Sequence, residues 1–303
     1  MTGLQFATCL SPVAPDEVRL LAASLGAFGG RYSGAELQAY DPRHQPPGDA
    51  DHTGDISKSI PVQVPPAFRD FPFAAKVFCA AQAEARAAQA GVPLLVWLDG
   101  DTLILQPPQL FDLPPGLDLA CRPVHHRLIG PAWGQPLDGF WREVYRVCSV
   151  PEERLFCMLT HVEEDPILPY FNAGLLVVRP EAGLLRTWAE AFQRHALAAP
   201  FQAFYQRDAR YRVFIHQALL AGALLNRLRA NQIRVLPADY NYPLHLHHQV
   251  PPERQPSRLD DLVTARYDGW QPQPGWRASL PAGPALARWL EDDWLAGSPQ
   301  STL

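Results

Sequence analysis

Apolar runs of strand length alternate with segments of helical periodicity along the first hundred residues of the chain. Residues 4–10 (LQFATCL) and 36–42 (ELQAYDP) predict strands, and residues 14–30 between them predict a helix with acidic residues in its first turn. An alanine-rich helix is expected over residues 73–91, followed by a strand over residues 93–99 (PLLVWLD), whose apolar run suggests cover on both faces. A strand–helix–strand order of this kind predicts a parallel sheet.

The rest of the chain continues the same alternation. Four more segments predict strands: residues 117–124, 170–180, 233–243 and 262–268. Three segments predict helices: about 137–147, 183–198 and 214–229. Residues 42–71 are rich in Pro, Gly and Asp and predict a long loop with a short strand near 61–65. We expect one mixed, mostly parallel α/β domain over residues 1–303, with its core at about 4–270 and a tail over 271–303 that carries a short helix.

Composition narrows the possible partners. The 303 residues carry a formal net charge of −5, which gives no reason to expect nucleic acid or an anionic membrane surface as a partner. The five cysteines are scattered without a CxxC pair and are expected to be reduced, mostly buried thiols. No signal peptide or membrane span is visible, so a cytoplasmic location is expected.

The stretch LLVWLDGDTLIL places two carboxylates, Asp99 and Asp101, at the end of the apolar strand. Residues two apart in an extended chain point to the same side, and ligands of open α/β sheets bind at the carboxyl ends of strands. Two carboxylates so close together repel each other unless a cation lies between them. Hard oxygen ligands suit Mg²⁺ or Mn²⁺, and such a metal could bind a substrate diphosphate.

Other interpretations of this pair stay open. An Asp-Gly dipeptide is common in turns, and Asp101 could cap such a turn. Haloacid-dehalogenase-like phosphatases have a strand followed by D-x-D-x-T with a nucleophilic first aspartate, here Asp99, although Thr102 comes one residue early. A sugar-1-phosphate nucleotidyltransferase would need a glycine-rich loop after the first strand, and CLSPVAP is not one.

Four segments together resemble nucleotide-sugar glycosyltransferases with the GT-A (Rossmann-like) fold: VWLDGDTLIL, YFNAGLLVVRP, FIHQALL and LPADYNYPL. Their order is most similar to glycosyltransferase family 8, the glycogenin and lipopolysaccharide-galactosyltransferase type, over about residues 4–270. The resemblance implies a metal-dependent transferase with Mn²⁺ or Mg²⁺ as cofactor. It also implies a nucleotide-sugar donor, with UDP as the nucleotide, and retention of anomeric configuration. The acceptor, whether a saccharide, a lipid-linked group or a protein, is left open, as is a non-catalytic nucleotide-sugar-binding role.

The resemblance also implies roles for individual residues near the donor phosphates. Asp99, Gly100 and Asp101 match the DxD motif that binds the metal and the diphosphate. Lys76 matches a basic residue that reaches the donor phosphates. Its alternative explanation is a solvated helix lysine, but the lysine lies near the start of a helix with few charges.

Further roles concern the sugar and the nucleoside. Asn172 and Gln217 match residues with catalytic roles, the first at the donor sugar and the second near the anomeric carbon, and Gly174 would let the backbone approach a ligand. Asn172 could instead be a satisfied polar group at a strand start. The end of the first strand would hold the base and ribose through Thr8, Cys9 and Ser11.

Two departures from the family pattern concern the acceptor and the metal. His216 replaces the aspartate of an Asp-Gln pair. Arg266 occupies the place of the histidine expected as third metal ligand, so either the metal has another ligand or Arg266 partly replaces a cation. The segment YPLHLHHQV offers imidazoles, and His245 and His247 would share a face if extended; His247 is taken as a candidate ligand. Trp133 and Trp141 could stack on sugar rings or serve as packing residues.

Overall fold

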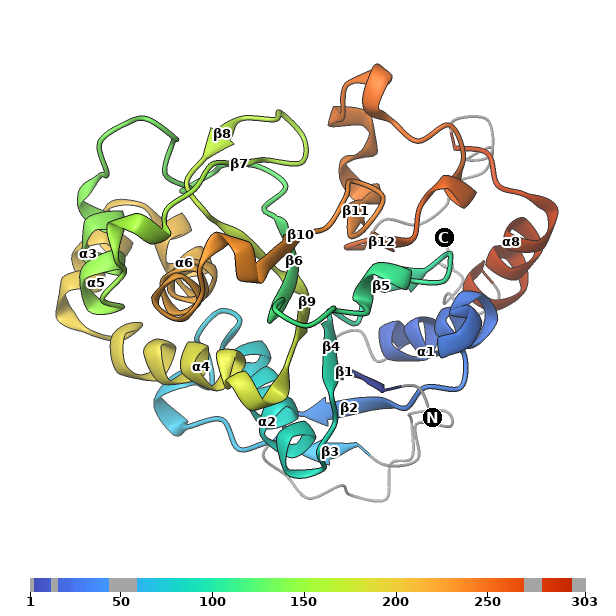
Figure 1. Ribbon diagram of the computed structural model, residues 1–303, viewed down its shortest axis with the longest axis horizontal. Coiled ribbons are helices and arrows are strands. Elements are labelled where there is room, and N and C mark those ends of the chain that lie inside the picture. The colour runs from blue at the N-terminus through green and yellow to red at the C-terminus, as the bar shows by residue number, and fades with distance from the viewer. Residues whose placement is uncertain (1–2, 12–15, 44–58, 270–279, 296–303) are drawn as a thin grey trace, which may run out of the picture.

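A mixed seven-stranded sheet forms the centre of the computed structural model, which describes residues 3–11, 16–43, 59–269 and 280–295 (Figure 1). Its strands, in spatial order, are β10 (Ile233–Val235), β6 (Leu119–Pro123), β9 (Phe171–Val178), β4 (Leu94–Leu98), β1 (Leu4–Cys9), β2 (Leu37–Asp41) and β3 (Ile60–Pro61). All neighbouring pairs are parallel except those made by β9, which runs antiparallel to both β4 and β6. The mostly parallel α/β class predicted from the sequence is confirmed.

Helices cover both faces of this sheet because its central strands are apolar on both sides. The helices are α1 (Asp16–Phe28), α2 (Ala74–Gln89), α3 (Gly139–Val147), α4 (Leu184–His195), α5 (Ala199–Arg207), α6 (Ala209–Arg227) and α8 (Pro284–Trp289). On β4, Leu95 and Trp97 pack in one core with residues of α2, α4 and α6, whereas Val96 and Leu98 pack in another with residues of α1. The alternation of the strand thus divides the interior into two layers.

A second, smaller sheet lies beyond the carboxyl end of β4 and has the order β11 (Tyr242–Pro243), β12 (Thr264–Arg266), β5 (Thr102–Ile104). β12 runs antiparallel to β5, and Arg266 is paired with Thr102. This sheet has its own apolar core, to which Leu103, Tyr242 and Ala265 contribute. A two-stranded sheet of β7 (Met158–Leu159) and β8 (Pro166–Ile167) completes the strands of the described residues.

Several boundaries differ from the sequence predictions. The strand expected over residues 233–243 is two short strands, β10 and β11, which belong to different sheets. The strand expected over 262–268 joins the small sheet as β12, beside the unpredicted β5. The helix expected over 214–229 begins at Ala209, and α5 precedes it. Half of the predicted loop at 42–71, residues 44–58, lies outside the described residues.

No helix in the described part of the chain combines the length and the hydrophobicity that a membrane span requires.

Glu84 of α2 connects helix α2 to the N-terminus of helix α4. Its fully buried carboxylate accepts hydrogen bonds from the backbone N–H groups of Leu185 (3.0 Å) and Arg186 (2.9 Å), which are free donors in the first turn of α4. Burial raises the pKa of Glu84, and these hydrogen bonds oppose that effect. The carboxylate therefore takes the place of a side-chain cap that α4 lacks in its own sequence.

Replacing Glu84 is expected to destabilise the protein. Glu84→Ala leaves the two buried N–H groups unpaired, which should lower the free energy of unfolding by about 2–4 kcal/mol. Urea denaturation followed by circular dichroism measures this loss. Glu190→Ala, an exposed position of the same helix α4, is the matched control and should change stability by less than about 0.5 kcal/mol. An equal, small effect of both substitutions would contradict the capping role.

Candidate active site

Asp99 and Asp101 lie in the tight turn that connects the large sheet to the small one. The backbone N–H of Asp99 donates to the carbonyl of Gly174 (2.9 Å), and the N–H of Tyr267 donates to the carbonyl of Asp101 (3.1 Å). The turn itself is closed by a hydrogen bond from Thr102 N–H to Asp99 O (3.2 Å). Both aspartates are therefore held by backbone contacts to β9 and to the end of β12, and their exposures are only 7% and 6%.

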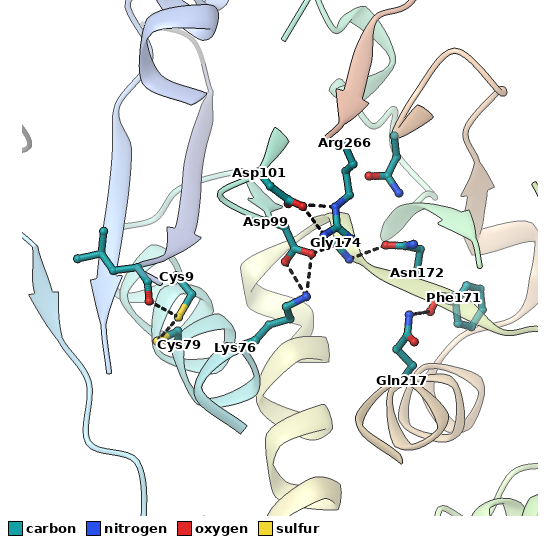
Figure 2. Close-up of polar contacts among 12 residues, drawn as sticks. Cys9, Lys76, Cys79, Asp99, Asp101, Phe171, Asn172, Gly174, Gln217 and Arg266 are labelled. Carbon is teal, nitrogen blue, oxygen red and sulfur yellow. Dashed lines mark hydrogen bonds and ion pairs between the residues drawn. The ribbon is translucent and has the colours of Figure 1, made fainter. Parts of the chain in front are cut away.

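Two cationic side chains pair with these carboxylates (Figure 2). Lys76 Nζ lies 2.7 Å from each carboxylate oxygen of Asp99. Arg266 holds Asp101 in a bidentate arrangement, with Nε 3.0 Å from Oδ1 and Nη2 2.6 Å from Oδ2. Its Nη1 is 3.2 Å from Asp99 Oδ2, so one guanidinium bridges both aspartates. We call Lys76, Asp99, Asp101 and Arg266 the charge cluster.

The electrostatics of the charge cluster follow from its burial. Burial raises the pKa of Asp99, but the positive charges of Lys76 and Arg266 outweigh it, so the pKa lies below its ordinary value. Burial would lower the pKa of Arg266, yet Asp101 and Asp99 raise it, so the guanidinium stays charged. Glu17, in the first turn of α1, lies beside Gly100; burial, and next the charges of Asp101 and Asp99, raise its pKa to about 7.

Phe73 precedes α2 in an unusual backbone conformation. Its φ of 58° is in the left-handed region, which is rarely occupied by a bulky residue and is often found at functional sites. The ring is 43% exposed, stacks on His216 with centroids 4.3 Å apart, and lies 5.1 Å from Lys76 Nζ. No sequence pattern indicated this residue, because an aromatic side chain before a helix is typical of packing.

Two residues of β9 and one of α6 bring polar groups to the same place. Asn172 Oδ1 accepts a hydrogen bond from Gly174 N–H (2.8 Å), and Gln217 Nε2 lies 3.5 Å from the carbonyl of Phe171 (Figure 2). A Cβ atom on Gly174 would lie 2.6 Å from Asp99 Oδ2 and 3.1 Å from Arg266 Nη1. Glycine is therefore required there for close packing of the charge cluster against β9.

A cavity of about 310 Å³ opens in front of these groups. It is lined by several of the residues predicted from the sequence: Lys76, Asn172, Gly174 and Gln217. Arg266, Phe73, His125 and His245 also line it, together with Asp268. Burial, and next the charge of Arg266, holds the pKa of His125 well below its ordinary value, so this ring is a neutral hydrogen-bonding group. The structure thus gathers two amide side chains, two cations and the neutral imidazole of His125 around one cavity.

The end of β1 does not contribute to this cavity. Thr8 is fully buried and its hydroxyl has no partner among the described residues, so the side chain expected at the nucleotide is enclosed in the interior. Cys9 is partly buried, and its Sγ lies 3.4 Å from Sγ of Cys79 (Figure 2). Ser11 is also partly buried, and residues 12–15 after it lie outside the described residues.

The residues around the charge cluster do not fit a divalent-metal site. Asp99 and Asp101 are already paired with cations, and a guanidinium stands where a ligating imidazole was expected. His247 accepts or donates a hydrogen bond at Nδ1 with Tyr242 Oη (2.9 Å) and does not line the cavity. Nowhere in the described ranges do three or more His, Cys, Asp or Glu side chains form a group that could hold a metal ion.

The two tryptophans considered as sugar platforms lie elsewhere. Trp141 is fully buried and its indole N–H donates to the carbonyl of Ile129, so it is a core residue. Trp133 is 43% exposed and lines a separate surface cavity together with Arg142 and Tyr145.

A family match identifies the chain as a glycosyltransferase, as the sequence predicted. Residues 15–218, more than half of the chain, match the family described as Rhodobacterales glycosyltransferase domain, and the chain belongs to that family. The match includes every predicted site residue from Lys76 to Gln217, whereas Arg266 lies outside it. The phosphatase alternative is not favoured by this result.

Three solved structures with a similar fold are distant from this chain in sequence. A galactosyltransferase LgtC, in complex with donor and acceptor sugar analogues, is 15% identical with a TM-score of 0.44, covering 99% of this chain and 97% of its own. A glycosyltransferase involved in glycosylation of the major capsid of PBCV-1 is 12% identical, with a TM-score of 0.42 and coverage of 88% and 94%. Mouse xyloside xylosyltransferase 1 is 12% identical, with a TM-score of 0.43 and coverage of 89% and 99%. No curated protein gave a significant match.

Gly174→Ala tests the packing of the charge cluster against β9. The added methyl group would overlap Asp99, which the ion pair with Lys76 holds in place, so we expect a loss of about 1–3 kcal/mol in unfolding free energy. Chemical denaturation measures the change. Gly26→Ala is the matched control: this exposed helical position has open space around its Cβ, and the substitution should be neutral or stabilising by up to about 1 kcal/mol. Wild-type stability in Gly174→Ala would show that the cluster can shift freely.

Proposed function

We propose that this glycosyltransferase takes its sugar from a nucleotide-sugar donor, a UDP-sugar, and transfers it with retention to an acceptor hydroxyl. The observation that carries the proposal is the joint position of Lys76 and Arg266 in one cavity with the amides of Asn172 and Gln217. Partly buried cations that line a cavity suit a diphosphate, and amides suit sugar hydroxyls. UDP and retention come from the resemblance to family 8.

The groups of the cavity support two separate roles during transfer, one for the cations at the phosphate and one for the amides at the sugar. When the bond between the anomeric carbon and the diphosphate breaks, negative charge grows on the leaving phosphate oxygen. Lys76 and Arg266 are already in position to stabilise this charge, so no reorganisation is needed during the reaction. Gln217 and Asn172 would hold the sugar by hydrogen bonds while the acceptor oxygen bonds to the anomeric carbon and its proton passes to the departing phosphate oxygen.

The positions of the carboxylates near the site favour a mechanism in which the acceptor attacks the anomeric carbon on the face from which the diphosphate leaves. A mechanism through a covalent glycosyl-enzyme intermediate would need a carboxylate nucleophile. Asp99 and Asp101 are held by cations and lie behind them. Asp268 is the remaining carboxylate among the described residues that line the cavity; its side chain is 60% exposed and lies 3.6 Å from His245. The described residues that line the cavity therefore include no buried, unpaired carboxylate that could act as a nucleophile.

Removing the charge of Lys76 is expected to weaken donor binding. Lys76→Met keeps the length of the side chain and deletes the ammonium, and the loss of one charge-assisted contact should raise the Kd for UDP by about tenfold or more. Isothermal titration calorimetry measures Kd, and circular dichroism checks the fold. The control is Arg69→Ala, an exposed cation just before α2. If UDP binds Lys76→Met as tightly as wild type, the diphosphate does not lie at Lys76.

Gln217→Ala should instead affect turnover. We expect the rate of UDP release from UDP-sugars to fall by about 10–100-fold, while the Kd for UDP changes by less than about threefold, because the amide faces the sugar and not the nucleotide. A coupled assay for UDP across a panel of UDP-hexoses, with and without saccharide acceptors, measures the rate. A parallel loss of UDP affinity would place Gln217 at the nucleotide instead.

A further inference from the structure

We propose that Arg266 takes the place of the divalent metal ion in this site, so that the donor diphosphate binds to a guanidinium and an ammonium without a metal. This inference rests on the proposed function and deepens it, because it specifies the cation that the donor site uses. The observation behind it is the position of the Arg266 side chain relative to the carboxylates of Asp99 and Asp101.

The guanidinium of Arg266 lies where a bridging cation would bind. It contacts both aspartates at once, with Nη2 2.6 Å from Asp101 and Nη1 3.2 Å from Asp99. The planar fork of arginine matches a carboxylate in bidentate fashion, and this is the geometry at Asp101. A metal ion bound between the same oxygens would have to expel a buried guanidinium and leave it without its partners, which is costly.

The charges of the cluster are already balanced. Asp99 and Asp101 contribute two negative charges, and Lys76 and Arg266 contribute two positive charges at contact distance. A divalent ion added to this group would face two fixed cations at short range, where the interaction between charges is strong and poorly screened. The repulsion that a metal relieves between neighbouring carboxylates is relieved here by side chains.

The arginine is held in place and still has donors available. β12 pairs with β5 so that Arg266 stands opposite Thr102, directly after the Asp99–Asp101 turn. Contacts to the two aspartates engage three of the five N–H groups of a guanidinium, which leaves two for another anion. Because both Arg266 and Lys76 line the cavity, these donors can reach a diphosphate on the open side.

The side chains that could supply a metal ligand instead lie in other arrangements. Asp268 is paired with His245 at 3.6 Å and is mostly exposed. Glu17 lies in the first turn of α1, beside Gly100. His247 is hydrogen-bonded to Tyr242. None of these groups joins the aspartates in a metal-binding group within the described residues.

The test is the binding of UDP to the protein of residues 1–303 with EDTA and with added Mn²⁺, measured by isothermal titration calorimetry. We expect wild type to bind UDP in EDTA, with a Kd that Mn²⁺ changes by less than about threefold. Arg266→His, which introduces the imidazole of the family pattern, should lose about tenfold or more in UDP affinity in EDTA and recover part of it with Mn²⁺. Arg266→Lys, which keeps a positive charge, should retain binding in EDTA better than Arg266→His does.

The outcomes separate this inference from the proposed function. UDP binding to wild type that requires Mn²⁺ would overturn the inference and leave the proposed function intact. Failure of UDP, and of GDP and ADP tested in parallel, to bind under either condition would contradict both. Electron paramagnetic resonance of Mn²⁺ with UDP, recorded with and without wild-type protein, gives a measurement that does not depend on any variant: the inference predicts no spectrum of protein-bound Mn²⁺, and the appearance of such a spectrum when protein is added would overturn it.

Discussion

The pairing of two buried carboxylates with two partly buried cations is the constraint on which this structure depends. Asp99 and Asp101 are almost inaccessible to water, and buried charges are tolerated only when they are paired and hydrogen-bonded. The required partners come from distant parts of the chain, Lys76 from the start of α2 and Arg266 from the end of β12. The fold must therefore bring a helix, the central strand and the last strand together before the aspartates can be buried.

The two sheets meet at this cluster, and that junction explains the placement of the cavity. β4 delivers the aspartates from the large sheet, and β5 continues directly into the small sheet, where it pairs with β12. Gly174 on the antiparallel strand β9 provides the close approach that lets the cluster pack without a side chain between. The polar groups of Asn172 and Gln217 then face the same opening, because β9 and α6 border it.

The sequence predicted the structure well where local residue patterns determine it. It predicted the structure less well where strands that are far apart in the chain pair with each other. The apolar run before Asp99 and the spacing of Asp101 indicated a strand end with a binding role, and Lys76, Asn172 and Gln217 do line one cavity. β5 has three residues whose pairing is supplied by β12 much later in the chain, and no local periodicity reveals such a strand. The left-handed backbone of Phe73 likewise depends on tertiary packing.

Thr8 and Arg266 show how far family patterns can be carried onto one sequence. Thr8 occupies the expected position at the end of the first strand, yet its side chain is fully buried, so position along the chain did not determine orientation. Arg266 occupies the expected position of a metal-binding histidine, and its long side chain returns to both aspartates. A guanidinium carries one positive charge that does not depend on metal supply and is not lost at physiological pH, whereas it cannot act as a Lewis acid. Because one such charge is weaker than a divalent ion, a second cation beside it is needed to balance two carboxylates, and Lys76 meets that need.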